Sequence, residues 1–170
     1  MCRYCLWLDF KGRILADSFL LKESDDSVLL VSYQSPSDTL MAKFERHIIA
    51  DDVEIENLTG QYELISFQNA DSAAPVLTEL GIEAPTKEQY ASNRGQVYSF
   101  RGRRLGLNTL DILVPRVIGT VEFVDSMSRK EAEACRLRNG IPMIPEDSEA
   151  ALANPLEMNI LSALSFDKGC

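Results

Sequence analysis

The sequence predicts an α+β protein built from two related lobes of strands and helices. Runs that alternate apolar and polar residues are followed by an amphipathic helix, and this order occurs twice along the chain. The 170 residues suit one domain or two small lobes that share a core. The apolar share of 45% and the charged share of 25% are ordinary for a globular protein. We therefore expect a first lobe over residues 1–60 and a second over residues 61–170.

The first lobe is expected to contain strands and one helix. Alternation and strand-forming residues predict strands at residues 4–9, 14–21, 27–33 and 52–57. The sequence Asp9-Phe10-Lys11-Gly12 predicts the turn between the first two strands, because glycine tolerates the conformation that ends it. Ser35-Pro36-Ser37 begins the helix. Its apolar stripe is formed by Leu40, Met41, Phe44 and Ile48.

The second lobe repeats this order with more elements. Strands are predicted at residues 62–68, 96–101, 109–114 and 120–124. The middle two form a hairpin across Gly102-Arg103-Arg104, and residues 82–94 are expected to form a loop. Helices are predicted from Asp71 to Gly81 and from Ser128 to Asn139, the latter with a Ser-x-x-Glu capping box. Asn154-Pro155-Leu156-Glu157 predicts a further helix start.

Charge and composition narrow the classes of function. The formal net charge is −9, a field that disfavours nucleic acid or anionic lipid as a partner of the whole surface. No apolar run approaches the roughly 20 residues that span a bilayer. The first residues also lack a signal-peptide pattern, so we expect a cytoplasmic protein without a membrane partner.

A bound metal is not predicted. Cys2 and Cys5 have CxxC spacing, but a zinc site would need a second pair of ligands, and His47 is the one histidine of the chain. We interpret the pair as two thiols on a strand. Cys135 is interpreted as a core residue of its helix.

Three blocks near the end of the chain are similar to those of a known family. They are Arg136-Leu137-Arg138-Asn139-Gly140-Ile141-Pro142, Pro155-Leu156-Glu157 with Asn159, and Phe166 with Lys168-Gly169-Cys170. Together they resemble the YgfZ-type branch of the folate-binding proteins related to the glycine-cleavage T-protein, in its mitochondrial-type form. The branch carries a Lys-Gly-Cys signature, and this sequence ends inside it. The resemblance implies duplicated strand-helix lobes and tetrahydrofolate as cofactor. It also implies truncation at both ends, without the C-terminal barrel.

The resemblance singles out Tyr4 and Asp17, which stand at positions similar to residues that line the folate site. Asp17 lies between Leu15 and Phe19 on one face of its predicted strand, where a buried carboxylate needs a partner. It could accept hydrogen bonds from a folate and act as a general base. Pairing with a neighbouring lysine or arginine is the alternative, and the sequence leaves both open.

Other candidate residues lie in the matched blocks. Arg136 and Glu157 are candidate folate contacts, although an acid at Glu157 also suits a helix start electrostatically. Cys170 is a candidate catalytic residue, because the ammonium of Lys168 beside it favours the reactive thiolate. Lys168, Gly169 and Cys170 form the family motif. A separate basic cluster, made by Arg101, Arg103 and Arg104, is either a solvated hairpin tip or an anion site.

The resemblance therefore implies a tetrahydrofolate-binding accessory protein of iron–sulfur cluster assembly or repair, with iron–sulfur assembly proteins as partners. Two alternatives stay open: an aminomethyltransferase-like enzyme that uses tetrahydrofolate, and a non-catalytic scaffold fragment. Arg138 stands where T-proteins carry a pterin-binding glutamate. Arginine cannot accept those hydrogen bonds, which disfavours aminomethyl transfer. Without the barrel an apolar groove wall would be uncovered, so we expect a homodimer or weak folate affinity.

Overall fold

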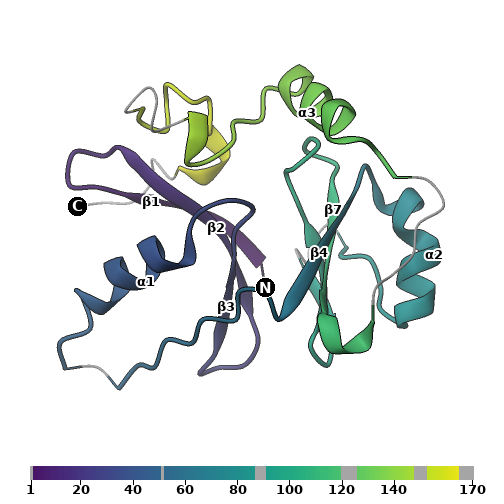
Figure 1. The fold of residues 1–170 in the computed structure, drawn as a ribbon, viewed down its shortest axis with the longest axis horizontal. Coiled ribbons are helices and arrows are strands. Elements are labelled where there is room, and N and C mark those ends of the chain that lie inside the picture. Colours follow the sequence, from purple (N-terminus) through teal and green to yellow (C-terminus); the bar gives the residue numbers. More distant parts are fainter. Residues whose placement is uncertain (1, 51, 87–90, 120–125, 148–152, 165–170) are drawn as a thin grey trace. The chain divides into compact units, whose positions relative to one another are not determined.

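The structure, a computed structural model, describes residues 2–50, 52–86, 91–119, 126–147 and 153–164. These residues form two antiparallel sheets and three α-helices (Figure 1), which confirms the mixed α+β class. Contacts divide the chain into two compact units. We call Leu58–Ile141, with which Cys2 groups, the central unit, and Arg3–Asn57 together with the described residues from Pro142 onward the terminal unit.

The terminal unit differs from the first lobe expected from the sequence. The described residues from Pro142 onward group with Arg3–Asn57, whereas the sequence placed all of residues 61–170 in the second lobe. Ile144 and Ile160 pack with Ile14 of the sheet. The backbone N–H of Ile14 also donates to the carbonyl of Ala153 at 3.0 Å. This return of the chain is a non-local contact, which hydrophobic periodicity does not report.

The sheet of the terminal unit has the order β1-β2-β3. Its strands are β1 (Cys2–Leu8), β2 (Ile14–Lys22) and β3 (Val28–Val31). The register between β2 and β3 runs from Phe19 opposite Val31 to Lys22 opposite Val28. β3 ends earlier than the sequence predicted. Residues 52–57 were also expected to be a strand, but they have no regular structure, and Val53 is 55% exposed.

The two faces of this sheet are covered by different segments. Helix α1 (Ser37–Glu45) packs through Phe44, whose ring meets that of Trp7 at 4.6 Å in an edge-to-face arrangement. Leu6 and Leu8 point to the opposite side of β1, because side chains alternate along a strand. There they pack in the cluster of Ile14, Ile144 and Ile160.

The central unit has a four-stranded sheet with the order β4-β7-β6-β5. Its strands are β4 (Tyr62–Phe67), β5 (Ala91–Arg94), β6 (Val97–Arg101) and β7 (Leu110–Pro115). β6 and β7 form the predicted hairpin, whereas β5 lies where a loop was expected. Helix α2 (Ala70–Leu80) buries its apolar residues against this sheet (Figure 1). The main core residues are Ala73, Val76, Leu77, Ile82, Val97, Leu110, Ile112 and Val114.

The helix ends follow local capping rules. α2 is capped by Asn69 rather than by the predicted Asp71, because the Asn69 side chain accepts from the Ser72 N–H at 2.9 Å. Helix α3 (Arg129–Arg138) begins with the predicted capping box. Its Ser128 hydroxyl donates to Glu131 at 2.6 Å and holds the pKa of that carboxyl below its ordinary value.

Two further predictions have different outcomes. Residues 155–159 form hydrogen-bonded turns instead of a helix, and Asn159 has a φ of 54°, which ends the turn. The strand predicted at 120–124 lies outside the described residues. Short 3₁₀ turns occur at Arg116–Ile118 and Leu161–Ala163. Among the described residues, no helix combines the length and apolar character needed to cross a membrane.

Candidate functional site

Asp17 lies in the middle of β2 and is only 5% exposed. Its two carboxylate oxygens each accept a hydrogen bond from a hydroxyl. Tyr4 of β1 donates to Oδ2 at 2.9 Å, and Ser35 donates to Oδ1 at 2.9 Å. Tyr4 and Asp17, which the resemblance assigned to one site, are therefore in direct contact. Both of these partners of the carboxylate are hydroxyl groups.

The Asp17 side chain is held where the ladder between β2 and β3 has ended. β3 stops at Val31, opposite Phe19, and the chain then turns across Asp17 toward α1. The backbone N–H of Asp17 donates to the Ser35 hydroxyl at 3.0 Å, and the Ser32 hydroxyl donates to the Asp17 carbonyl. Two serine side chains thus take the backbone groups that a longer β3 would have paired.

Aromatic rings lie beside this carboxylate. The Tyr4 ring centroid is 5.2 Å from that of Phe19, and Phe19 in turn meets Tyr33 edge-to-face at 5.5 Å. Phe19 is 2% exposed. The cluster thus combines a carboxylate held by two hydroxyls with the apolar surface of three aromatic rings. We call Tyr4, Asp17, Phe19, Tyr33 and Ser35 the Asp17 cluster.

Arg136 belongs to the central unit and is 8% exposed. Its guanidinium pairs with Glu133, one turn earlier on α3, with 2.9 Å between Nε and Oε2. It also donates to the carbonyl of Ile141 at 2.7 Å. These bonds tie the end of α3 to the residues that follow it, which is a structural use of the arginine.

Glu157 is exposed and serves the local backbone. Its carboxylate accepts from the Asn154 N–H at 2.9 Å, while the Asn154 side chain accepts from the N–H groups of Leu156 and Glu157. This reciprocal arrangement is a capping box on a single turn. The electrostatic role considered for Glu157 from the sequence is thus the one that its contacts support.

The remaining sequence candidates have mixed outcomes. Lys168, Gly169 and Cys170 lie outside the described residues, so their role stays a prediction. Cys2 and Cys5 both lie on β1, as expected, and alternation directs their side chains to opposite faces. No group of three or more potential metal-ligating side chains occurs in the described part of the chain.

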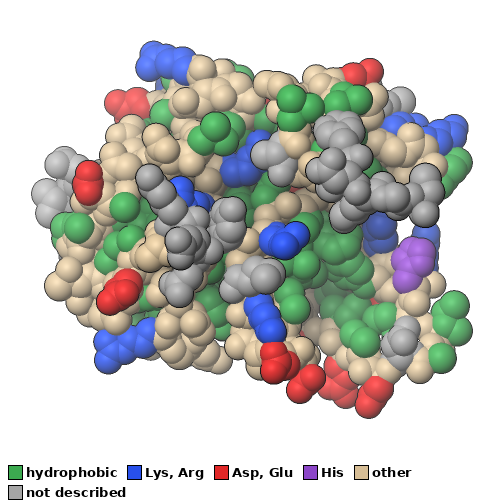
Figure 2. All heavy atoms as spheres, turned by 180° about the vertical axis from the view of Figure 1, so that it is seen from behind, with side chains coloured by type: hydrophobic (Ala, Val, Ile, Leu, Met, Phe, Trp, Pro, Cys, Tyr) green, Lys and Arg blue, Asp and Glu red, His purple; other side chains and the backbone are tan. Residues whose placement is uncertain are grey.

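Cys135 of α3 is half-buried, and its thiol donates to the carbonyl of Leu105 at 3.2 Å. That contact ties α3 to the connection between β6 and β7. The nearby basic residues Arg101 and Arg104 are exposed, and Arg103 is half-buried. On the face drawn in Figure 2, basic side chains are scattered among apolar and acidic ones.

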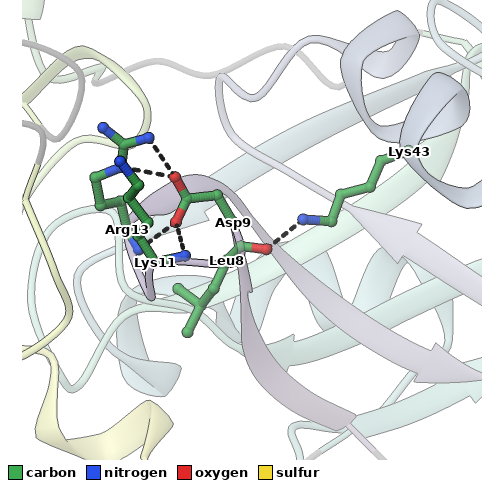
Figure 3. Close-up of polar contacts among 5 residues, drawn as sticks. All are labelled: Leu8, Asp9, Lys11, Arg13 and Lys43. Atoms are coloured by element: carbon green, nitrogen blue, oxygen red, sulfur yellow. Dashed lines mark hydrogen bonds and ion pairs between the residues drawn. The ribbon is translucent and has the colours of Figure 1, made fainter.

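The corner between β1 and β2 is fixed by Asp9 (Figure 3). Its Oδ1 accepts from the N–H groups of Lys11 and Arg13, at 2.8 and 2.9 Å, and its Oδ2 pairs with the Arg13 side chain. The Arg13 N–H is the main reason that the pKa of Asp9 lies below 3.8. Lys43 of α1 donates to the Leu8 carbonyl beside this corner (Figure 3). Both contacts hold the end of β1 and the turn that follows it.

Two sets of residues that the structure shows at buried carboxylates were not predicted from the sequence. Ser32 and Ser35 contact Asp17. The sequence feature that could have indicated them is the presence of two serines shortly after the strand that pairs with β2. Asp111 of β7 is a second buried carboxylate, with no exposed surface. A Cβ added to Gly102 would lie 2.2 Å from its Oδ2. An aspartate between Leu110 and Ile112 in a strand was the available signal for that site.

Comparison with known proteins gives no assignment: no protein-family model matches the sequence, and a search of curated proteins finds no significant match.

Proposed function

We propose that this chain binds tetrahydrofolate through the Asp17 cluster. The supporting observation is the 2.9 Å hydrogen bond between the Tyr4 hydroxyl and the Asp17 carboxylate. These two residues are 13 positions apart and were assigned to one ligand site by resemblance alone. Their contact across β1 and β2 is what a shared role at one site requires.

The proposed chemistry is recognition rather than a reaction at Asp17. A carboxylate can accept hydrogen bonds from the N–H groups of a pterin ring, because each oxygen has lone pairs beyond the one used by a hydroxyl. The rings of Tyr4 and Phe19, with centroids 5.2 Å apart, form the apolar surroundings of this carboxylate. In the proposed biology the bound folate belongs to iron–sulfur cluster assembly or repair. Cys170 would then act as a thiolate, and iron–sulfur assembly proteins would be the partners.

A non-catalytic scaffold is the second candidate. The observation that favours it is the use of Arg136 and Glu157 in local caps, with bonds of 2.7 Å from Arg136 to the Ile141 carbonyl and 2.9 Å from Asn154 to Glu157. Residues occupied in this way contribute to the fold whether or not a ligand binds. On this account, the Asp17 cluster would also serve only to hold β1 and β2 together.

Calorimetric titration with tetrahydrofolate distinguishes the two candidates. We expect saturable one-to-one binding by the unaltered chain, and a loss of about tenfold or more in affinity for Asp17→Asn, which removes a charged acceptor. Asp26→Asn is the matched control, because it makes the same change at an exposed position in the β2–β3 turn. Tyr4→Phe provides a second test if Asp17→Asn does not fold.

Two results would count against the proposal. A folded, unaltered chain that takes up no tetrahydrofolate supports the scaffold instead. Equal affinities for the unaltered chain, Asp17→Asn and Tyr4→Phe would place folate binding away from this cluster.

A further inference from the structure

Ser35 contacts Asp17 at two points. Its hydroxyl accepts from the Asp17 N–H at 3.0 Å and donates to Asp17 Oδ1 at 2.9 Å. One hydroxyl can do both, because it carries one donor and two acceptor lone pairs. The main chain and the side chain of Asp17 are therefore held by the same group, which comes from the connection between β3 and α1.

The second carboxylate oxygen is held from another direction. Tyr4, on β1, donates to Oδ2 at 2.9 Å. The terminal torsion of an aspartate is ordinarily broad and roughly two-fold, so a carboxylate held at one oxygen can still rock. Donors at both oxygens select one orientation of its plane.

We infer that Ser35 is a positioning residue, which fixes the orientation in which the Asp17 carboxylate meets N–H donors of the ligand. This inference rests on the proposed function, since the ligand is taken to be tetrahydrofolate. Ser35 acts through Asp17, and directional hydrogen bonds from a planar heterocycle gain most when the acceptor is oriented before binding.

A purely structural role for Ser35 leads to different expectations. The two hydrogen bonds of the serine would then contribute only to the stability of the fold, and their loss would lower stability without changing the ligand affinity. The carboxyl resonance reports whether Asp17 is disturbed, and the ligand affinity separates the two roles.

The test compares Ser35→Ala, Ser35→Thr and Ser37→Ala. Threonine keeps the hydroxyl, whereas Ser37, the first residue of α1, makes the matched control because its hydroxyl contacts Asn57 at 3.2 Å. The first readout is the carboxyl carbon resonance of Asp17 in the chain labelled with ¹³C-aspartate, assigned with Asp17→Asn. The second is calorimetric titration with tetrahydrofolate.

We expect Ser35→Ala to displace the Asp17 resonance and to weaken tetrahydrofolate binding about tenfold, because a carboxylate held at only one oxygen must be ordered when the ligand binds. Ser35→Thr should restore both, and Ser37→Ala should change neither. An Asp17 resonance or an affinity that is unchanged in Ser35→Ala overturns the positioning role.

The proposed function and this inference can be refuted independently. If the unaltered chain does not bind tetrahydrofolate while Ser35→Ala displaces the resonance, the folate assignment is wrong, and Ser35 still orients Asp17. If Ser35→Ala does not fold, Tyr4→Phe tests the same idea from the other oxygen. It should displace the same resonance, and an unshifted signal there would contradict the two-donor arrangement.

Discussion

Gly102 is the position at which the structure predicts the sharpest loss of stability. It follows β6 directly, and its N–H donates to the carbonyl of Thr109 at 2.9 Å. A Cβ at this residue would lie 2.2 Å from Oδ2, 2.4 Å from Cγ and 2.7 Å from Oδ1 of Asp111. Ordinary contact begins at 3.4 Å. Asp111 is fully buried, so its carboxylate cannot swing into solvent to relieve the overlap.

We therefore expect Gly102→Ala to lower the free energy of unfolding by about 3 kcal/mol, the upper end of the range for overpacked cores. For a chain of this size, that lowers the unfolding temperature by about 6 to 12 °C. The assay is thermal and urea unfolding followed by circular dichroism. The cost should shrink in an Asp111→Ala background, where the three atoms that clash are gone, giving a coupling energy on the order of 1–3 kcal/mol.

Gly95→Ala is the matched control for this cycle. Gly95 has a φ of +58°, and no atom lies within 4 Å of a Cβ built there. Gly95→Ala should lower the free energy of unfolding by about 1–2 kcal/mol through backbone strain. This loss should be the same in the unaltered chain and in the Asp111→Ala background. The reasoning about Gly102 is wrong if Gly102→Ala unfolds at the temperature of the unaltered chain. It is also wrong if its cost is the same in both backgrounds.

Two further predictions concern the ends of local elements. Asn69→Ala removes the cap of α2 and should lower the free energy of unfolding by about 1 kcal/mol in urea titrations; Asn69→Asp, which keeps the acceptor, should stay close to the unaltered chain. The lowered pKa of Asp9 means that its charged form stabilises the β1–β2 corner above pH 3.8, and that this contribution is lost as the pH falls through the lowered pKa. Asp9→Asn should therefore show a shallower drop in unfolding temperature below pH 3.8 than the unaltered chain, whereas identical pH profiles would contradict this origin of the shift.

Local features of the fold were predictable because short-range chemistry determines them. The Ser128 capping box fixed the start of α3, and Asp9 with Gly12 fixed the turn between β1 and β2. The hairpin of β6 and β7 was predicted for the same reason. The early end of β3 was not predictable, because Ser32 and Ser35 replace the ladder through side chains from outside the strand.

Long-range packing accounts for what the sequence did not predict. Ile144 and Ile160 pack on the first sheet, although more than a hundred positions separate them from Ile14 along the chain. In the candidate site, Tyr4 and Asp17 could be paired by resemblance. Ser35 was missed, because a serine between a strand and a helix is ordinarily interpreted as part of the helix start. Buried carboxylates at Asp17 and Asp111 were visible only as polar residues in apolar strands.

The most direct test of the central claim is to follow the amide and carboxyl resonances of the intact chain while tetrahydrofolate is added. If the Asp17 cluster binds the ligand, saturable changes should concentrate at Tyr4, Asp17 and Ser35 and should be reduced in Asp17→Asn, with Asp26→Asn behaving as the unaltered chain does. Saturable changes that leave all three residues untouched, or a spectrum that does not respond to tetrahydrofolate, would contradict the claim.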